Sequence, residues 1–376
     1  MDVRLRLQGR GARSGDLALI LAPREGVRRR TREIGLEFLY FLIRRLLWSL
    51  LVLLGLSIVI FVIARVMPGD PARLALGPRA SQEQVDDLKA KMGLDRPLAE
   101  QYQHFLVGLA HGDLGLSFLT KRPVNDDIAD TFAATFELVL ATIAIGFLVG
   151  VPLGVVAAAD KDGLVDNAVR FGAIIGAVTP SFLLALLLQV LAGYDLHVLP
   201  TTGRLSPNSP VHPDITGLLT LDTLLKGDLA GFGDALRHLL LPSLALSAAT
   251  VGQIARITRS SMIDVAKQDY IEAGRAFGVP DRVRVFKYML RPAFVPPMTI
   301  LGLEFASLLG NAFVVELVFA WPGMASYGVR SILQKDLNAV MGVVMISGLF
   351  FVLANLTIDV LVGFVDPRVR IRGSQA

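Results

Sequence analysis

Two carboxylates lie in an otherwise apolar stretch, residues 293–320, where ionisable groups are costly. Glu304 and Glu316 interrupt this stretch. A charge at the centre of a bilayer costs at least ~2.5–3.5 kcal/mol, so such a group normally faces protein or water. Glu304 and Asn311 are seven residues apart, which places them on nearly one face of a helix. The spacing predicts a polar face that lines a path for a solute.

A structural role is the alternative for these carboxylates. A Glu that is protonated or hydrogen-bonded can join neighbouring helices instead of lining a path. Glu316 lies about a third of a turn away from the Glu304 face by the helical repeat. It is also near the end of the stretch, where Trp321-Pro322-Gly323 indicates a re-entrant or interfacial turn. We keep both interpretations for Glu304 and Glu316.

Several kinds of chemistry are absent from the sequence. The chain has no cysteine, which excludes disulfides, thiol catalysis and cysteine-ligated metals. Its five histidines show no metal-ligand spacing, so we expect no metal site, although a metal ion as cargo is left open. No G-x-x-x-x-G-K-[ST] phosphate loop and no Gly-Lys pair occur, so nothing here is expected to cradle ATP. We expect no catalytic residue and no cofactor, and a net charge of +4 gives no reason to expect nucleic acid as a partner.

The loop 256–291 contains the most informative polar pattern. The run from Gln268 to Phe277 is typical of a short helix, and Gly278 suits the left-handed position that follows a helix. Pro280 then prevents the helix from continuing. Asp281 is expected to cap a second short helix, in which three apolar side chains share one face: Val283, Phe286 and Leu290.

This pair of short helices has the properties of a docking element. Three small residues in the first helix would let another surface approach closely: Ala273, Gly274 and Ala276. Glu272 precedes them and is expected either to pair with a basic group on a partner or to cap the loop locally. A charged hydrogen bond of that kind, if partly buried, is worth about 1.5–3 kcal/mol.

The elements that must position these groups are transmembrane helices. The chain has 376 residues, 53% of them hydrophobic, and a mean hydropathy of +0.56, which indicates a membrane protein. A spanning helix needs about 20 largely apolar residues. Four stretches meet this requirement without a charge, and two weaker ones bring the total to six: 46–64, 138–159, 171–194, 338–358, 239–255 and 293–320. The fold class is therefore all-α.

Small and polar residues within these spans predict how they pack. Gly146, Gly150 and Gly154 form a G-x-x-x-G-x-x-x-G pattern, and Gly172 and Gly176 form another, which favours close contact between helices. Pro152 and Pro180 are expected to kink their helices. Gln189 and Gln253 are expected to make hydrogen bonds between helices.

Charge distribution predicts which side of the membrane each loop faces. The first 45 residues contain eleven arginines, and the 256–291 loop contains eight basic and four acidic residues. The segment 67–131 is acidic by comparison, with seven basic and ten acidic residues. The positive-inside rule then places both termini and the 256–291 loop in the cytoplasm.

The domain organisation follows from these spans. We expect a basic, disordered extension at 1–36, a first transmembrane helix at 37–67 and an extracytoplasmic helical insertion at 68–131. The insertion follows the first span and precedes the second. Ser81-Gln82-Glu83-Gln84 fits a capping box at the start of a helix, although chance is an equal alternative. A five-helix core at 132–365, which includes the 256–291 loop, and a cytoplasmic tail at 366–376 complete the chain.

The 256–291 loop resembles a known motif. Glu272-Ala273-Gly274, followed by Gly278 and then Leu290, is similar to the "EAA…G…L" loop of ATP-binding-cassette importer permeases. In that family the loop forms coupling helices that sit in a cleft of an ATPase subunit. The resemblance implies a coupling role for seven residues: Glu272, Ala273, Gly274, Ala276, Phe277, Gly278 and Leu290. The chain departs from the pattern at Gly274, where Ala is usual, at Tyr288, where Ile is usual, and at Pro292, which comes one place late.

Further segments narrow the resemblance to the dipeptide and oligopeptide group of these permeases, which includes nickel and glutathione importers. The similarity covers roughly residues 41–372 in one register. Its segments, as they stand in this sequence, are Met67-Pro68-Gly69-Asp70-Pro71, Gly93-Leu94-Asp95-Arg96-Pro97-Leu98, Gly112-Asp113-Leu114-Gly115, Ile254-Ala255-Arg256-Ile257-Thr258-Arg259-Ser260-Ser261-Met262, Val315-Glu316, Phe319-Ala320-Trp321-Pro322-Gly323 and Asp366-Pro367-Arg368.

The resemblance implies a set of partners and a location. It implies a second homologous permease subunit, two ATP-binding-cassette ATPase subunits and an extracytoplasmic substrate-binding protein. It also implies a multi-pass protein in the lipid bilayer of the bacterial cytoplasmic (inner) membrane. The cargo is expected to be a peptide or a related small solute, and the sequence does not discriminate among these solutes.

Two other classes of function are alternatives. A secondary transporter or channel that acts alone would explain the membrane carboxylates, but it has no need of a docking loop. A membrane-embedded enzyme would require a nucleophile–base or metal arrangement, and the sequence has none. A permease subunit of an importer remains the leading interpretation.

Overall fold

The computed structural model describes residues 25–66, 71–77, 79–91, 93–207, 209 and 215–365. The chain divides into two units: Leu50–Val365, and a unit that combines Met1–Ser49 with Asp366–Ala376. The 256–291 loop and the stretch 293–320 both belong to Leu50–Val365. The expected tail at 366–376, with its Asp366-Pro367-Arg368 motif, and the stretch 67–70 lie outside the described residues.

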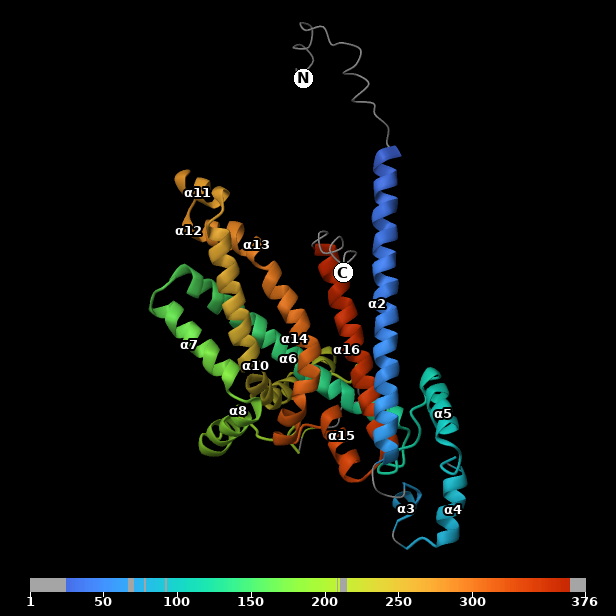
Figure 1. Ribbon diagram of the computed structural model, residues 1–376. Helices are drawn as coiled ribbons and strands as arrows, with labels where there is room; N and C mark the ends of the chain where they lie inside the picture. Colours follow the sequence, from blue (N-terminus) through green and yellow to red (C-terminus); the bar gives the residue numbers. More distant parts are fainter. Residues whose placement is uncertain are drawn as a thin grey trace. The chain divides into compact units, whose positions relative to one another are not determined.

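The described residues form helices and no β-strand, and an isolated bridge joins Leu116 to Pro123. The expected all-α fold is therefore confirmed. Figure 1 shows the elements in order along the chain: α2 (Glu25–Val66), α3 (Pro71–Leu76), α4 (Gln82–Lys91), α5 (Leu98–Ala110), α6 (Val124–Ala159), α7 (Leu164–Val178), α8 (Ser181–Leu188), the π-helix η1 (Gln189–Asp195), α9 (Leu219–Leu225), α10 (Leu229–Ala266), α11 (Asp269–Ala276), α12 (Asp281–Val283), the π-helix η2 (Arg284–Met289), α13 (Leu290–Ala293), α14 (Val295–Val318), α15 (Met324–Leu333) and α16 (Leu337–Val365).

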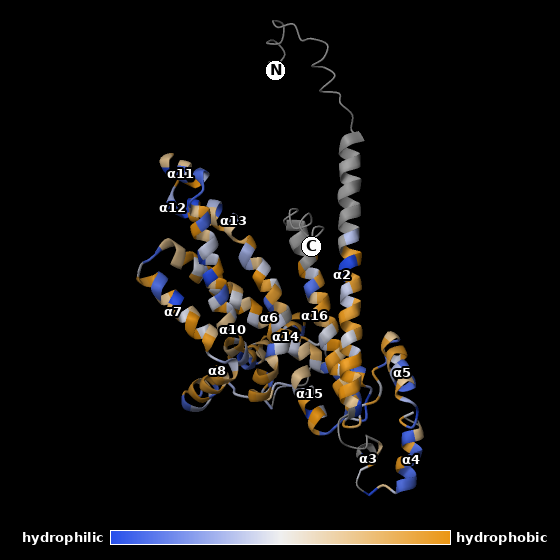
Figure 2. Ribbon diagram, in the orientation of Figure 1, coloured by the Kyte–Doolittle hydropathy of each residue, from blue (hydrophilic) through white to orange (hydrophobic). Residues whose placement is uncertain are grey.

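Six membrane spans fit the helices, as predicted. Four single helices are long and apolar enough to cross a membrane: Leu42–Arg65, Val124–Ala159, Leu229–Ala266 and Leu337–Ile358. Two bent pairs bring the number to six if each pair is one span: Leu164–Val178 with Ser181–Asp195, and Val295–Phe305 with Ser307–Val318. In Figure 2 hydrophilic residues gather on α4 and α12, and the long helices that separate these two elements in space are mainly apolar.

The third span is not the continuous helix that its apolar run 171–194 suggests. The chain bends by 103° between α7 and α8. Thr179 has an extended backbone, with φ −73° and ψ 120°, because a residue that precedes proline is disfavoured in the helical region. Pro180 therefore ends α7 instead of only kinking a longer helix.

The G-x-x-x-G-x-x-x-G pattern of α6 packs against α10, as predicted. A Cβ atom on Gly154 would lie 2.5 Å from Cβ of Thr258, and one on Gly150 would lie 3.0 Å from Cβ of Ile254. Such distances leave no room for a side chain, so the glycines let the two helices approach closely. In the second pattern, Gly172 and Gly176, only one glycine makes a close contact. Gly176 touches the backbone of Ala248, but a Cβ atom on Gly172 would meet nothing within 4 Å.

The first helix begins earlier than predicted. α2 starts at Glu25, inside the stretch 1–36 that was expected to be a disordered extension, and residues 1–24 lie outside the described part of the chain. No proline occurs between Pro23 and Pro68, so nothing in the backbone chemistry stops the helix from extending toward the amino terminus.

The insertion after α2 is helical, with α3, α4 and α5. Ser81 and Gln84 form the predicted capping box: the amide N–H of Gln84 donates to Oγ of Ser81, and the amide N–H of Ser81 donates to Oε1 of Gln84 at 2.9 Å. α5 is held to α2 by a hydrogen bond of 2.8 Å between the hydroxyls of Tyr102 and Ser57. The ring of Phe61 lies against the same tyrosine.

Candidate docking surface and membrane cavity

The predicted helix–turn–helix is present at the end of α10. α11 covers Asp269–Ala276, and Gly278 follows with φ +74°, in the left-handed region that glycine adopts without strain. The turn is closed by two backbone hydrogen bonds, from Gly278 N–H to the Arg275 carbonyl at 3.1 Å and from Val279 N–H to the Gly274 carbonyl at 2.9 Å. This is the pattern of a glycine-terminated helix.

The second arm of this helix–turn–helix, formed by α12 and η2, differs from the prediction in two ways. Pro280, not Asp281, occupies the capping position, and the Asp281 carboxylate accepts a hydrogen bond of 2.5 Å from Arg284. The arm also continues as the π-helix η2, whose wider turn changes which residues share a face.

The buried face of this arm is correspondingly shifted. The predicted face of Val283, Phe286 and Leu290 is wrong, because Val283 and Phe286 are exposed. Leu290 does pack inward, together with Val285 and Met289. These three contact a buried cluster on α6, α10, α13 and α14: Val151, Val155, Ile254, Met262, Ala293 and Leu301.

Four exposed aromatic side chains surround the turn. Phe277 is 88% exposed and Phe286 is 63% exposed, and Tyr270 and Tyr288 are also largely exposed. The hydroxyl of Tyr270 donates to the backbone carbonyl of Tyr288 at 3.5 Å, which links the two arms. Large exposed aromatics on a short projecting hairpin are typical of a protein-binding surface.

The small and acidic residues of the hairpin lie on the same projecting element. Glu272, Ala273 and Ala276 are exposed, and Gly274 is half-buried. A Cβ atom on Gly274 would lie 3.8 Å from a methyl group of Val279, an ordinary contact, so the alanine that is usual in related sequences would fit here. In Figure 1 α11 and α12 lie at one end of the Leu50–Val365 unit and α3 and α4 at the other.

A buried ion pair joins α7 to α10 near the hairpin. Asp166 is fully buried and accepts two hydrogen bonds from the guanidinium group of Arg259, one of them 2.5 Å long from Nη2. It also accepts the amide N–H of Asp162. In the sequence Arg259 stood out only as part of a motif, and Asp166 was missed. The one available signal was an acidic residue close to the start of an apolar segment.

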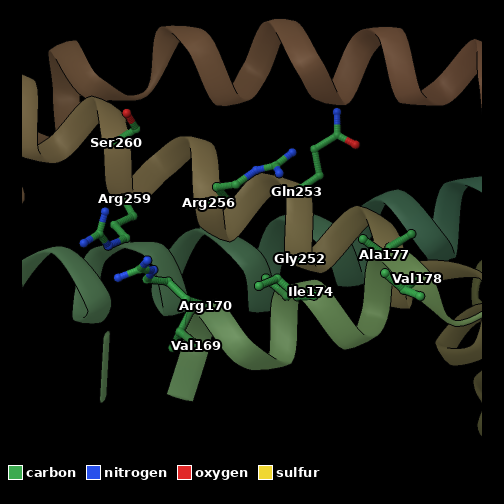
Figure 3. Close-up of a pocket in the computed structure, with 12 residues that line it drawn as sticks. Val169, Arg170, Ile174, Ala177, Val178, Gly252, Gln253, Arg256, Arg259 and Ser260 are labelled. Atoms are coloured by element: carbon green, nitrogen blue, oxygen red, sulfur yellow. The ribbon is translucent and has the colours of Figure 1, made fainter. Parts of the chain in front are cut away.

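A cavity of about 790 Å³ lies between α7 and α10, and no sequence pattern indicated it. Arginines gather at one part of its wall, and Gln253 and small apolar residues form much of the rest. In Figure 3 Gln253 points away from α7, toward the helix drawn along the top of the view. The lining residues are Val169, Arg170, Ala173, Ile174, Ala177, Val178, Ala249, Gly252, Gln253, Arg256, Arg259 and Ser260.

Glu304 and Asn311, which were predicted to share a polar face, have different surroundings in the structure. Glu304 on α14 is half-buried, and the hydrogen bond between helices expected for Gln253 stays a prediction. Asn311 is exposed and donates a hydrogen bond to Ser307 on its own helix. A bend of 55° between Phe305 and Ser307 separates them, so α14 does not present one straight polar face.

Glu316 is fully buried and bonded within the chain. Its carboxyl group accepts hydrogen bonds from the hydroxyl of Thr135 on α6, at 2.5 Å, and from the amide of Ser326 at the start of α15, at 3.1 Å. An acceptor at a helix start satisfies amide groups that have no partner inside the helix. This geometry corresponds to the structural alternative, in which a hydrogen-bonded Glu joins helices.

Another buried carboxylate, Glu137 on α6, was missed because it directly precedes the apolar run. It pairs with Arg204 at 2.5 Å and accepts hydrogen bonds from the amide and hydroxyl of Thr220. The Arg204 guanidinium also lies over the ring of Trp321, 5.7 Å from its centre. Within the described part of the chain, no group of three or more His, Asp or Glu side chains could hold a metal ion.

Comparison with known protein families finds matches along nearly the whole chain. Residues 150–371 match the family described as "Binding-protein-dependent transport system inner membrane component", and residues 38–139 match the amino-terminal region of such membrane components. The first match covers more than half of the chain.

Individual relatives are similar over most of their length. A probable D,D-dipeptide transport system permease protein of Escherichia coli is 41% identical over 331 residues, 87% of this chain and 97% of the relative. A dipeptide transport system permease protein of Alkalihalophilus pseudofirmus is 36% identical over 332 residues, 88% of this chain and 99% of the relative. A glutathione transport system permease protein of Pectobacterium atrosepticum is likewise 36% identical over 332 residues, with the same coverage.

The helical membrane fold, the projecting hairpin and these matches lead to one conclusion. The chain belongs to the family of binding-protein-dependent transport system inner membrane components, and it is the multi-pass permease subunit of an ATP-binding-cassette importer, not an enzyme.

Proposed function

We propose that this permease imports short peptides, or a related small solute, as one half of a translocation path in the bacterial cytoplasmic membrane. Relatives at 36–41% identity carry names that specify dipeptide, D,D-dipeptide or glutathione transport, which supports a cargo of this class. The other half of the path is a second homologous permease subunit. An extracytoplasmic substrate-binding protein delivers the cargo, and two ATPase subunits supply the energy.

The hairpin formed by α11, α12 and η2 is the proposed ATPase contact, and the observation that carries this proposal is the exposure of Phe277. A side chain of that size, 88% exposed at the tip of a glycine-closed turn, gains buried area only by entering a partner. Ala273, Gly274 and Ala276 keep the first arm thin enough to fit a cleft. Glu272 adds a charged contact, and Gly278 fixes the angle between the arms.

Packing of the second arm offers a route for force into the membrane. Leu290, Val285 and Met289 contact the buried cluster on α6, α10, α13 and α14. Interiors packed this closely move as rigid pieces instead of deforming continuously. Displacement of the hairpin by ATP-driven closure of the ATPase dimer would therefore tilt these spans together, between inward-open and outward-open states.

Both chain termini and the hairpin are proposed to be cytoplasmic, and the insertion α3–α5 extracytoplasmic. The basic residues of the 256–291 loop and the excess of acidic residues in 67–131 support this orientation. For the path itself we retain Glu304 and Asn311 as proposed lining residues, since Glu304 is half-buried and Asn311 is exposed. For Glu316 we propose the structural role, because it is fully buried among contacts within the chain.

The docking proposal is tested by removing the Phe277 ring. In the complete complex reconstituted in proteoliposomes, Phe277→Ala should weaken retention of the ATPase subunits and lower peptide uptake about tenfold or more, as expected when a central aromatic anchor is lost. Leu164→Ala is the matched control, because Leu164 is equally exposed, at 88%, but lies on α7 outside the hairpin. Equal ATPase retention and uptake in both variants would contradict the proposal.

A further inference from the structure

A second pocket, of about 490 Å³, opens where the first membrane span meets the α3–α5 insertion. α2 contributes Arg65, the last residue of that span, and α16 contributes Asn338 from its first turn. Residues of α5 form another part of the wall. The volume lies within the roughly 300–1,000 Å³ that small-ligand pockets enclose.

Two segments that carry the family resemblance also line this pocket, 93–98 and 112–115, and the hairpin mechanism assigns no task to either. Gly115 has φ +82°, and a Cβ atom on it would lie 3.0 Å from Nδ2 of Asn338. The same Nδ2 donates a hydrogen bond of 3.0 Å to the carbonyl of Leu116. The second segment is therefore fixed against α16 by a close approach that requires glycine.

Two buried polar atoms in the wall have no hydrogen-bond partner among the described residues: Nε of Arg65 and Oε1 of Gln101. Gln101 is only 8% exposed, and its amide nitrogen already donates to the carbonyls of Leu94 and Arg96, at 3.2 and 2.7 Å. The Arg65 guanidinium lies over the ring of Phe61, 5.0 Å from its centre. Because an unpaired buried donor or acceptor is destabilising, a ligand that pairs with both atoms is favoured.

Both signs of charge line the pocket. Arg65 and Arg96 are the basic groups, and Arg96 donates to Nε2 of His104 at 2.9 Å. Asp113 is the acidic group, and its Oδ1 accepts the amide N–H of Gly115 at 2.8 Å, which leaves Oδ2 for a ligand. Guanidinium groups recognise phosphate through paired N–H groups, and an ammonium group donates to carboxylate and amide oxygens.

The position of the pocket indicates a lipid as the source of these two groups. Arg65 ends the apolar stretch Leu42–Arg65, at the level where a span leaves the hydrocarbon and meets the headgroups. Ile58 and Val62 precede Arg65 by seven and three residues, so they share its face of α2, and they are 47% and 51% exposed. This face provides an apolar track for an acyl chain, from which a soluble phosphate or peptide gains nothing.

We propose that the pocket binds a phospholipid headgroup of the phosphoethanolamine type. Arg65 and Arg96 bind the phosphate, and the ammonium group donates to Oε1 of Gln101 and to the Asp113 carboxylate. One acyl chain follows the exposed apolar face of α2 below Arg65. The bound lipid then joins α2, α5 and α16 at the membrane surface, whatever solute the permease imports.

The test measures lipid binding to the complete, delipidated complex in detergent by native mass spectrometry. The probes are phosphatidylethanolamine, phosphatidylcholine and phosphatidylglycerol with the same acyl chains. The quaternary ammonium of phosphatidylcholine has no N–H to donate, and phosphatidylglycerol has no ammonium group. The wild-type complex should therefore bind phosphatidylethanolamine about tenfold more tightly than either, the effect of one charged hydrogen bond.

Two variants separate the contacts to phosphate and to ammonium. Arg65→Gln should weaken binding of phosphatidylethanolamine and phosphatidylcholine alike, about tenfold, because both carry the phosphate. Asp113→Asn should lower phosphatidylethanolamine binding to the level of phosphatidylcholine, and its Oδ1 can still accept the Gly115 amide. The control is Arg237→Gln, which removes an exposed arginine of α10 outside the pocket and should change neither lipid.

Several outcomes would overturn the assignment. Equal binding of the three lipids by the wild-type complex, or tighter binding of phosphatidylglycerol, would do so without any variant having to fold. Wild-type lipid binding by Arg65→Gln would indicate that water alone fills the pocket, and an equal loss in Arg237→Gln would indicate a general effect of surface charge. Dipeptide uptake by the same complex tests the proposed function separately, since lipid selectivity without uptake would refute that function alone.

Discussion

At the scale of single residues, the hairpin depends most on Gly278. Its φ of +74° lies in the region that L-amino acids with a side chain avoid, and a β-branched residue avoids it most strongly. Gly274, four residues earlier, is in the body of α11, where alanine is the better helix former. The two glycines therefore have opposite requirements, although they belong to one short motif.

Replacing these two glycines should have opposite effects. Gly278→Val strains the turn by about 1–2 kcal/mol and re-aims the second arm, so ATP hydrolysis should continue while uptake falls strongly. Gly274→Ala should preserve uptake and stabilise the hairpin by roughly 0.5–1 kcal/mol. Parallel assays of ATPase activity and uptake on assembled complexes measure both effects. Normal transport by an assembled Gly278→Val complex would refute the proposed role of this turn.

At the scale of elements, the Asp166–Arg259 pair ties α7 to α10 where the cavity begins. Both oxygens of the buried carboxylate are occupied, by the guanidinium group and by the Asp162 amide. A buried charge that loses its partner is strongly destabilising, whereas removal of both charges costs less. The pair thus fixes the relation between two helices that otherwise touch mainly through small residues.

A double-mutant cycle should reveal this coupling. Asp166→Ala alone should destabilise the permease by about 3–5 kcal/mol, and the double variant with Arg259→Ala should be less destabilised than the sum of the two single changes. The Asp264–Lys267 pair at the carboxyl-terminal end of α10 is the control, since its side chains are 69% and 68% exposed, and its cycle should give no more than about 1 kcal/mol. Thermal unfolding in detergent provides the measurement, and purely additive effects at Asp166 and Arg259 would count against the coupling.

At the scale of the whole molecule, the orientation in the membrane decides which surface meets which partner. The insertion α3–α5 and the hairpin lie at opposite ends of the Leu50–Val365 unit (Figure 1). If the hairpin meets a cytoplasmic ATPase, the insertion must face the compartment from which the binding protein delivers cargo. One orientation in the membrane therefore determines both the ATPase contact of the hairpin and the binding-protein contact of the insertion.

Cysteine labelling can test this topology, because the natural chain has no cysteine and only the introduced residue can react. Glu83→Cys on α4 should react with a membrane-impermeant maleimide in intact spheroplasts. Lys161→Cys, in the loop between α6 and α7, should react only after the membrane is opened. Both positions are exposed, so accessibility within the protein does not limit the reaction. The reverse labelling pattern would place the hairpin outside the cell and contradict the proposed ATPase contact.

Much of the local structure could be predicted from the sequence. Runs of about 20 apolar residues indicated the spans, Gly278 and Pro280 indicated the end of α11, and Ser81 with Gln84 indicated the start of α4. Each of these features depends on residues close together in the chain, through backbone conformation or hydrogen bonds within one turn. The family resemblance then connected the hairpin with a function.

Other features depend on neighbours that are distant in sequence. The shift of the buried face in η2 arises where Val285, Met289 and Leu290 meet α6 and α10, so the helical period alone misplaced it. Glu316 could be interpreted as a path residue or as a structural one until Thr135 and Ser326 were seen to occupy its oxygens. The partner of Arg259 and the cavity beside Arg170 and Arg256 likewise required the packing of α7 against α10.

The sequence alone thus determined the membrane class, the helical elements and the turn of the hairpin, because the bilayer demands long apolar helices and the backbone demands glycine at a left-handed turn. Only the tertiary structure decided which carboxylates and arginines pair and where a cavity opens. Those properties depend on which helix faces meet, and contacts between residues far apart in the chain are not encoded in any local pattern.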